Sequence, residues 1–564
     1  MWPFSTSTRS YQTIVSAKLA ERHAKLVGAP EFSAAVHQEI LEASATEIVR
    51  RIEKGVWTAS QVLDAYIARA VQAQAKTNCL TEILFEEARA TARQLDADFV
   101  VTKKLKGPLH GVPLSIKDQF DVAGVDSSVG FTRWANNPAT EDAVVVHHLR
   151  AAGAIPFVKT NVPQTMLAFE CSNPLWGRSL NPWSDAHTCG GSSGGEAALL
   201  AMDGSAAGIG SDIGGSLRIP AAYCGIYSLK PGYARTSLEG AKDPAAGFEA
   251  IKTSAGPMGR SVDDIELIAR AIIGKRGSGY LPAPVPYRDV KIPSKLRFGY
   301  YITDGFVKAS PACRRAVLET VKALQLEGHE CLEIELPEPI RAIELFTGIT
   351  SSDGYSKLTS HLGPDPQESS LFLVTLGPRL PGFVRSVAGC LIRTFMDPIF
   401  GSLVGHSRTK TVREFYDYAE EKNEFEKRWR CEVWGNHDID AIIAPVQATP
   451  ALPHGACNEL SPLAAATILY NVVDSPVGII PVTRVDPIQD QITEEWVIEP
   501  GHGSTVVEGM LYGKKIYDPV KMKGLPVSVQ IVGQPWEEEK VIGMMHVVDK
   551  ALGKRDFGPG SWQP

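Results

Sequence analysis

Residues 189–232 read CGGSSGGEAALLAMDGSAAGIGSDIGGSLRIPAAYCGIYSLKPG, and this tract constrains the fold more than any other part of the chain. It holds nine glycines and five serines between Gly190 and Pro220. A flexible linker shares that composition, but linkers do not carry apolar runs such as AALLAM. The tract is therefore expected to be folded and to build a site from closely packed loops.

On both sides of this tract, helical periodicity alternates with short apolar runs that are typical of strands. Upstream, residues 60–76 place apolar side chains on one helical face, and residues 111–116 form an apolar run. Downstream, residues 296–301 and 526–532 are apolar runs separated by helical patterns. Helices between strands predict an α/β fold, a three-layer α/β/α sandwich around a large β-sheet. Residues 1–564 are expected to form one domain, in which residues 1–58 are an N-terminal helical segment.

The composition excludes several classes of protein. With 44% apolar and 21% charged residues, the 564-residue chain is typical of globular proteins rather than disordered ones. A net charge of −7 argues against a nucleic-acid partner, because nucleic-acid binders need a basic face. The nine cysteines are scattered and form no C-x-x-C pair, which argues against a disulfide framework or a structural zinc site.

The sequence also bears on location. Residues 1–15 hold no long apolar core, so no signal peptide is expected. No stretch reaches about 18 uninterrupted apolar residues, so no transmembrane helix is expected either. We therefore predict an intracellular protein, either cytoplasmic or attached peripherally to a membrane.

Two serine arrangements in the tract could support nucleophilic catalysis. The pattern G-x-S-x-G occurs around Ser192 and again around Ser193, but an elbow of this kind needs an apolar strand directly before it. The preceding NPWSDAHTC is polar, which disfavours this reading, although His502 and His546 keep it open. A phosphate-binding loop is disfavoured as well, because no G-x-x-x-x-G-K-[ST] is present.

The second arrangement is Asp212-Ile213-Gly214-Gly215-Ser216. Glycines let consecutive backbone N–H groups turn toward one point, where they can stabilise an oxyanion beside Ser216. Ser216 would then be the nucleophile and would need a base. His187 is one candidate, and Lys117, which closes the apolar run in GVPLSIKD, is the other. Lys117 could act as a base only if burial kept it neutral.

The tract from Gly190 to Gly225, together with the upstream GVPLSIKD, resembles the signature of the amidase signature family of serine hydrolases. The resemblance implies a large mixed, twisted sheet and a Ser-Ser-Lys triad that needs no metal or cofactor. Ser216 matches the acylated nucleophile, Ser192 the serine that relays a proton, and Lys117 the general base. The oxyanion N–H donors match Ile213, Gly214, Gly215 and Ser216, while Asp212 and Arg218 match flanking positions that we expect to brace the loop.

Other blocks are similar to fatty acid amide hydrolases. These blocks are KTNVPQTMLAFECSNPLWGRSLNPW from Lys159, YNVVDSPVGIIPVTRV from Tyr470 and GLPVSVQIVGQPWEEEKV from Gly524. The resemblance implies that Met166 and Leu167 line the substrate channel. Fungal-type short-chain acetamidases share much of the pattern from Lys159 to Gly232, so chain-length preference stays open. Residues 486–523 contain no block that we can match to the family, so we expect the channel floor or the leaving-group side to differ there.

Residues 371–410 form a strongly apolar, basic segment interrupted by prolines. On a helical wheel Val384, Val387, Ala388, Leu391, Ile392 and Phe395 share one face. Such an element suits the interface of a bilayer, and in fatty acid amide hydrolases the corresponding element is a membrane-docking cap. A buried core helix or a contact between two subunits of a homodimer are the alternatives.

These features predict a hydrolase that cleaves the carboxamide bond of N-acyl amines, with a lipid-like substrate favoured. The alternative with the same triad is a hydrolase of small aliphatic amides or carbamates. A glutaminase-type subunit with tRNA partners is disfavoured by the acidic net charge. A non-catalytic, membrane-associated binding protein is disfavoured because Lys117, Ser192 and Ser216 are all present.

Overall fold

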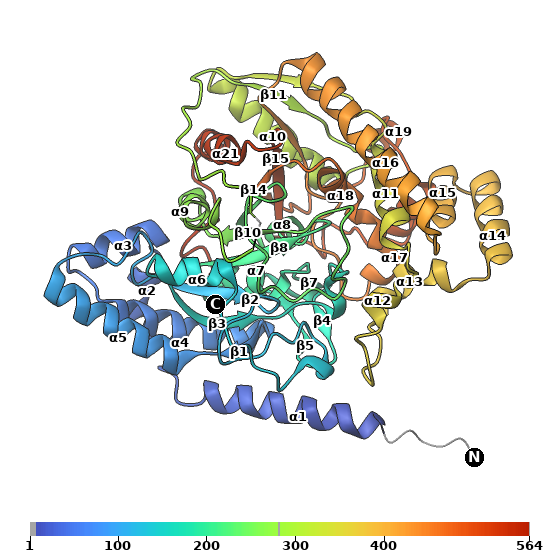
Figure 1. Ribbon diagram of the computed structural model, residues 1–564. Helices are drawn as coiled ribbons and strands as arrows, with labels where there is room; N and C mark the ends of the chain where they lie inside the picture. The colour runs from blue at the N-terminus through green and yellow to red at the C-terminus, as the bar shows by residue number, and fades with distance from the viewer. Residues whose placement is uncertain (1–6, 280–281, 563–564) are drawn as a thin grey trace.

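The computed structural model describes residues 7–279 and 282–562, and an eleven-stranded mixed sheet runs through its centre (Figure 1). The pairs from β8 to β13 in the middle of the sheet are antiparallel, whereas parallel pairs, such as β2 with β3 and with β8, lie toward its two ends. The strands, in sheet order, are β1 (Leu80–Ile83), β3 (Ile155–Thr160), β2 (Pro113–Lys117), β8 (Ala207–Asp212), β10 (Ser254–Gly259), β9 (Tyr227–Lys230), β14 (Val477–Arg484), β15 (Pro526–Val532), β13 (Ala441–Pro445), β11 (Arg297–Tyr300) and β12 (Glu330–Glu333).

Helices cover both faces of this sheet, as β10 shows. A Cβ at Gly256 would meet Leu217, directly before α8, whereas a Cβ at Gly259 would meet Asp264 of α9. Residues of opposite parity point to opposite faces of a strand, so α8 and α9 lie on opposite sides. The predicted three-layer architecture is confirmed. The helices include α5 (Phe85–Thr102), α6 (Val144–Ala151), α7 (Gly194–Ala201), α8 (Arg218–Cys224), α9 (Val262–Ile272), α11 (Pro339–Thr350), α16 (Val412–Trp429), α18 (Ala465–Val472) and α21 (Glu538–Leu552).

Elements expected from periodicity form where they were predicted. Helix α4 (Ala59–Thr77) begins at a capping box in which the Thr58 side chain accepts from the Gln61 amide. Helix α10 (Pro311–Leu326) begins after the N-cap Ser310 with proline in its first turn, where the missing N–H costs nothing. Strand β15 spans the whole of the expected run.

The N-terminal region is helical, as expected, with α1 (Ser7–Leu26), α2 (Ala34–Leu41) and α3 (Ala45–Glu53). Helix α1 runs along the sheet edge beside β1 (Figure 1). It is anchored there by the buried Lys18, whose ammonium lies 2.6 Å from Glu82 and 3.0 Å from Asp126. A buried ion pair of this kind fixes one docking position for the helix.

Residues 371–410, called the cap below, form α13 (Phe372–Arg379), α14 (Gly382–Phe395) and α15 (Pro398–His406). Helix α14 stands at the outer edge of the molecule (Figure 1). Its expected apolar face is divided, because Ala388 and Ile392 turn inward to a cavity while Leu391 and Phe395 are 52% and 79% exposed. The buried-core interpretation of this segment is therefore wrong.

Within the described residues, no helix combines the length and the apolar character that crossing a bilayer requires.

Candidate active site

Lys117 ends β2 and is completely buried. Its ammonium nitrogen lies 2.7 Å from the Ser192 hydroxyl and 2.8 Å from the Ser211 hydroxyl. Burial lowers the pKa of Lys117 to about 7, and the nearby Asp212 and Glu196 carboxyls offset only part of that effect. A large fraction of the amine is therefore neutral at physiological pH and can accept a proton.

Ser192 and Ser216 lie on neighbouring loops at the same end of the sheet. Ser192 follows a cis peptide bond with Gly191 and precedes α7, while Ser216 lies between β8 and α8. The two loops are joined where the Ser193 amide donates to the Ser216 carbonyl at 3.2 Å. The structure therefore places the Lys117 amine beside the Ser192 hydroxyl and joins the loops that carry Ser192 and Ser216.

An ion pair braces the loop that carries Ser216. The Arg218 guanidinium donates to both Asp212 oxygens, at 2.8 and 3.0 Å, and all these atoms are buried. Burial opposes ionisation of Asp212, but the Arg218 charge and its hydrogen bonds prevail and hold the pKa of this carboxyl well below its usual range. Asp212 also accepts from the Leu217 amide at 3.0 Å. The bracing role expected of Asp212 and Arg218 agrees with these contacts.

The amides before Ser216 differ in what they contact. The Gly215 amide, which was expected to serve an oxyanion, donates to Asp212 at 2.8 Å. Gly215 has φ +128°, which favours glycine, and a Cβ there would lie 2.3 Å from Thr467. Among described residues, the amides of Ile213, Gly214 and Ser216 have no intramolecular partner. Three of the four expected donors are therefore free to stabilise an oxyanion.

A cavity of about 360 Å³ extends from Ser216 to the cap. At the Ser216 end it is bordered by Ile213, Gly214, Met166 and Leu167, and the last two are the residues that the resemblance places in a substrate channel. At the other end its walls are cap side chains, almost all apolar: Leu373, Val374, Leu376, Leu380, Ala388, Ile392, Phe400, Leu403 and Val404. A ligand with a long apolar part fits this shape.

The alternative nucleophiles and bases lie in unsuitable surroundings. Ser193 is completely buried, and the strand before it, β7 (Ser184–Thr188), belongs to a separate two-stranded sheet. His187 lies 2.8 Å from the Ser184 hydroxyl, and burial lowers its pKa to about 4. His502 contacts Glu508, and His546 contacts Glu266 at 3.0 Å. The nucleophile-elbow interpretation is therefore not supported by the packing around Ser193.

Two polar groups beside Lys117 were not predicted from sequence. Ser211, on β8, accepts from Lys117 and donates to the side-chain oxygen of Gln119. Glu196, on α7, is completely buried and accepts from the Ser115 and Thr160 hydroxyls; burial raises its pKa to about 7, although those hydroxyls and Lys117 oppose the change. The only sequence signal for Ser211 was its place three residues before the glycine pair Gly214-Gly215.

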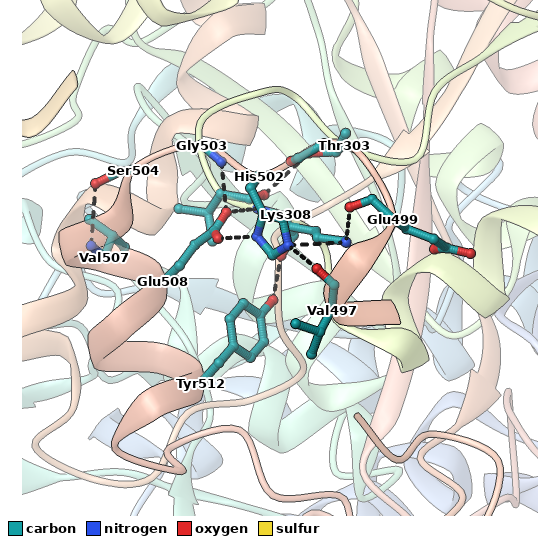
Figure 2. Close-up of polar contacts among 12 residues, drawn as sticks. Thr303, Lys308, Val497, Glu499, His502, Gly503, Ser504, Val507, Glu508 and Tyr512 are labelled. Carbon is teal, nitrogen blue, oxygen red and sulfur yellow. Dashed lines mark hydrogen bonds and ion pairs between the residues drawn. The ribbon is translucent and has the colours of Figure 1, made fainter. Parts of the chain in front are cut away.

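Residues 486–523 fold into short helices, including α19 (Glu494–Ile498) and α20 (Thr505–Glu508), around a polar cluster (Figure 2). The Lys308 ammonium donates to the Glu499 carbonyl at 2.6 Å and lies 3.3 Å from the His502 ring. The Glu508 carboxylate contacts the other ring nitrogen of His502 and accepts from the Lys308 amide at 2.8 Å. The cluster fixes this segment to residues 303–308.

The same segment holds the start of α15. The Ser504 hydroxyl and the Val506 amide both donate to the buried Asp397 carboxylate, the latter at 3.0 Å. Asp397 is the N-cap of α15 and accepts from the Ile399 and Phe400 amides. Residues 486–523 therefore hold the cap through hydrogen bonds to the start of α15, and none of them lines the cavity.

Comparison with known proteins agrees with these features. The family model described as Amidase matches residues 61–542. Fatty-acid amide hydrolase 1 of Sus scrofa is 34% identical over 514 residues, covering 90% of this chain and 85% of that protein. Acetamidase of Aspergillus oryzae is 32% identical over 525 residues, covering 91% and 90%. A solved structure of fatty acid amide hydrolase superposes with a TM-score of 0.81 at 27% identity, covering 96% of this chain and 90% of that one. The chain belongs to the amidase family.

Proposed function

We propose that this hydrolase of amides acts on N-acyl amines with long or medium acyl chains. The observation that carries the proposal is the apolar cavity that connects Ser216 to the cap. A short acyl group would leave most of that surface without contacts, whereas an alkyl chain would bury it at about 25 cal/mol per Å². The similarity to fatty-acid amide hydrolase 1 supports the same substrate class.

The proposed chemistry uses Lys117, Ser192 and Ser216 in sequence. Neutral Lys117 accepts the Ser192 proton while Ser192 accepts that of Ser216, and the Ser216 oxygen bonds to the carbonyl carbon. The oxyanion is held by the free amides of Ile213, Gly214 and Ser216. The proton then returns through Ser192 to the amine nitrogen as the C–N bond breaks, which leaves acyl-Ser216 and free amine. Water attacks the ester, and the carboxylic acid leaves.

The exposed side of the cap is proposed to rest in a bilayer interface. Phe383, Val387, Leu391 and Phe395 are between 52% and 79% exposed on α14. Four bulky apolar side chains on one exposed helix suit a lipid surface, and Arg393 beside them suits its headgroups. A second subunit could cover the same face, and a homodimer stays a prediction.

The matched alternative is hydrolysis of small amides by the same residues, which the similarity to acetamidases favours. A panel of N-acyl amines graded from two to eighteen carbons separates the two. A kcat/KM that rises with chain length supports the proposal, and a maximum at two carbons overturns it.

A fluorophosphonate probe should label wild type and the Ser193→Ala variant, but not Ser216→Ala; labelling of Ser216→Ala would contradict the assigned nucleophile.

A further inference from the structure

Two hydroxyl groups compete for the Lys117 amine. The Ser192 and Ser211 oxygens lie 2.7 and 2.8 Å from its nitrogen, so distance does not distinguish them. A neutral amine has two N–H donors but a single lone pair. If Ser211 donated its proton to that lone pair, Lys117 could not accept from Ser192. Lys117 can therefore act as a base toward Ser192 only if another group keeps the Ser211 hydroxyl from donating to its lone pair.

Gln119 is the group that occupies the Ser211 proton. The Ser211 hydroxyl donates its one proton to the side-chain oxygen of Gln119. Ser211 then has only lone pairs left for Lys117, which must donate to it. The amine lone pair remains for Ser192. Lys117, Ser211 and Gln119 are all at most 4% exposed, so these three groups must satisfy one another.

The backbone fixes Gln119 in this position. Gln119 lies in the turn directly after β2, which the Phe120 amide closes by donating to the Lys117 carbonyl at 3.1 Å. The Gln119 carbonyl accepts from the Lys242 amide at 2.8 Å. Ser211 approaches from β8, the neighbour of β2 in the sheet. The side-chain oxygen of Gln119 is therefore held opposite Ser211 by elements that do not touch the substrate cavity.

We propose that Gln119 is a positioning residue that, through Ser211, directs the Lys117 lone pair toward Ser192. The proposal rests on the proposed function, because it matters only if Lys117 is the base. The arrangement also serves the later step: once Lys117 carries the extra proton, its ammonium donates to Ser211 and to Ser192 together. Ser211 thus stays an acceptor throughout, and only Ser192 changes from donor to acceptor.

A double-mutant cycle tests this inference. Gln119→Met keeps the length of the side chain but removes the acceptor, so the Ser211 hydroxyl can turn toward the Lys117 lone pair. We expect kcat for an N-acyl amine to fall roughly five- to tenfold, the worth of one hydrogen bond, while KM is unchanged. In the Ser211→Ala background no hydroxyl can compete, so Gln119→Met should then have no effect on kcat.

Equal losses from Gln119→Met in both backgrounds would mean that Gln119 acts by packing alone and would overturn the inference. No loss in either background would overturn it as well. If wild type hydrolyses no amide, the proposed function fails instead. The same cycle is then measured as the rate at which a fluorophosphonate labels Ser216, which needs an activated serine but no amide turnover.

Discussion

Lys117 is a buried amine whose pKa falls to about 7, and in the proposed mechanism its protonation state sets the pH dependence of the reaction. Only the neutral amine can act as a base, so we expect kcat/KM for amides to rise through pH 7 and level off above pH 8. Glu196, whose pKa also lies near 7, and the ionised Asp212 face the same amine. The Glu196→Gln variant is the control, and it should keep the rise and shift its midpoint to lower pH.

In the proposed mechanism Lys117 also returns a proton to a poor leaving group. Lys117→Ala should therefore reduce kcat for an amide far more than kcat for the ester with the same acyl chain, because alkoxide leaves with less assistance. Steady-state kinetics on a matched amide and ester measure the ratio. Equal losses on both substrates would contradict a lysine-driven relay.

The same burial predicts how stability changes with pH. In the unfolded chain Lys117 titrates near 10.5, against about 7 in the fold, so the unfolded state binds more protons between these values. The free energy of unfolding therefore rises with pH across this window, by up to about 5 kcal/mol in all. Urea unfolding measures this free energy for wild type and for the Lys117→Met variant. Wild type should be less stable than the variant at pH 6, and its free energy of unfolding should rise relative to that of the variant toward pH 10. If the difference in unfolding free energy between the two proteins did not change with pH, the Lys117 amine would not be buried as described.

The buried Asp212–Arg218 ion pair contributes to the stability of the fold as well as to the geometry of the candidate site. Arg218→Met leaves an uncompensated carboxylate inside the protein and should cost about 3–5 kcal/mol of unfolding free energy. Arg50→Met is the matched control, since the Arg50–Glu47 pair is on the surface and should contribute far less to the unfolding free energy. Denaturant unfolding of both variants measures the two losses. Similar losses of unfolding free energy would contradict a stabilising role for the buried Asp212–Arg218 pair.

At the scale of elements, α15 depends on the segment that supports it. Ser504→Ala removes one of the two donors that residues 486–523 extend to Asp397. Because α15 lines the cavity far from Ser216, we expect kcat/KM for long acyl chains to fall several-fold while that for short chains is unchanged. Ser504→Thr keeps the hydroxyl and should behave as wild type. A uniform loss over all chain lengths would refute this link.

How far the sequence predicts these elements depends on whether the signal is local. Capped helices such as α4 and apolar strands such as β15 follow from nearby residues and formed as expected. The Ser-Ser-Lys set could be predicted because its glycine-rich surroundings are distinctive. Gln119 was missed, because its partner Ser211 is brought beside it only by the pairing of β2 with β8. The link between Asp397 and Ser504 spans 107 residues and leaves no local pattern.

For the whole molecule, the exposed side of α14 should decide where the protein resides. Replacing Phe383, Leu391 and Phe395 together by serine should reduce sedimentation with phospholipid vesicles more than tenfold, since about 25 cal/mol is lost per Å² of apolar surface. Turnover of a short, water-soluble amide should not change. Val100→Ser with Val101→Ser, at exposed positions of α5, is the control. Unchanged sedimentation of the triple variant would instead direct attention to a subunit contact.

The nine cysteines are all free, and Cys390 and Cys431 are the two exposed ones. Cys390 lies within α14, next to Leu391, whereas Cys431 lies beyond the cap. With Cys431 and the half-buried Cys331 replaced by serine, a maleimide fluorophore has a single accessible native attachment point, and it lies on α14. Its emission would shift to the blue in lipid and would report immersion in real time, without introducing any new residue into the helix.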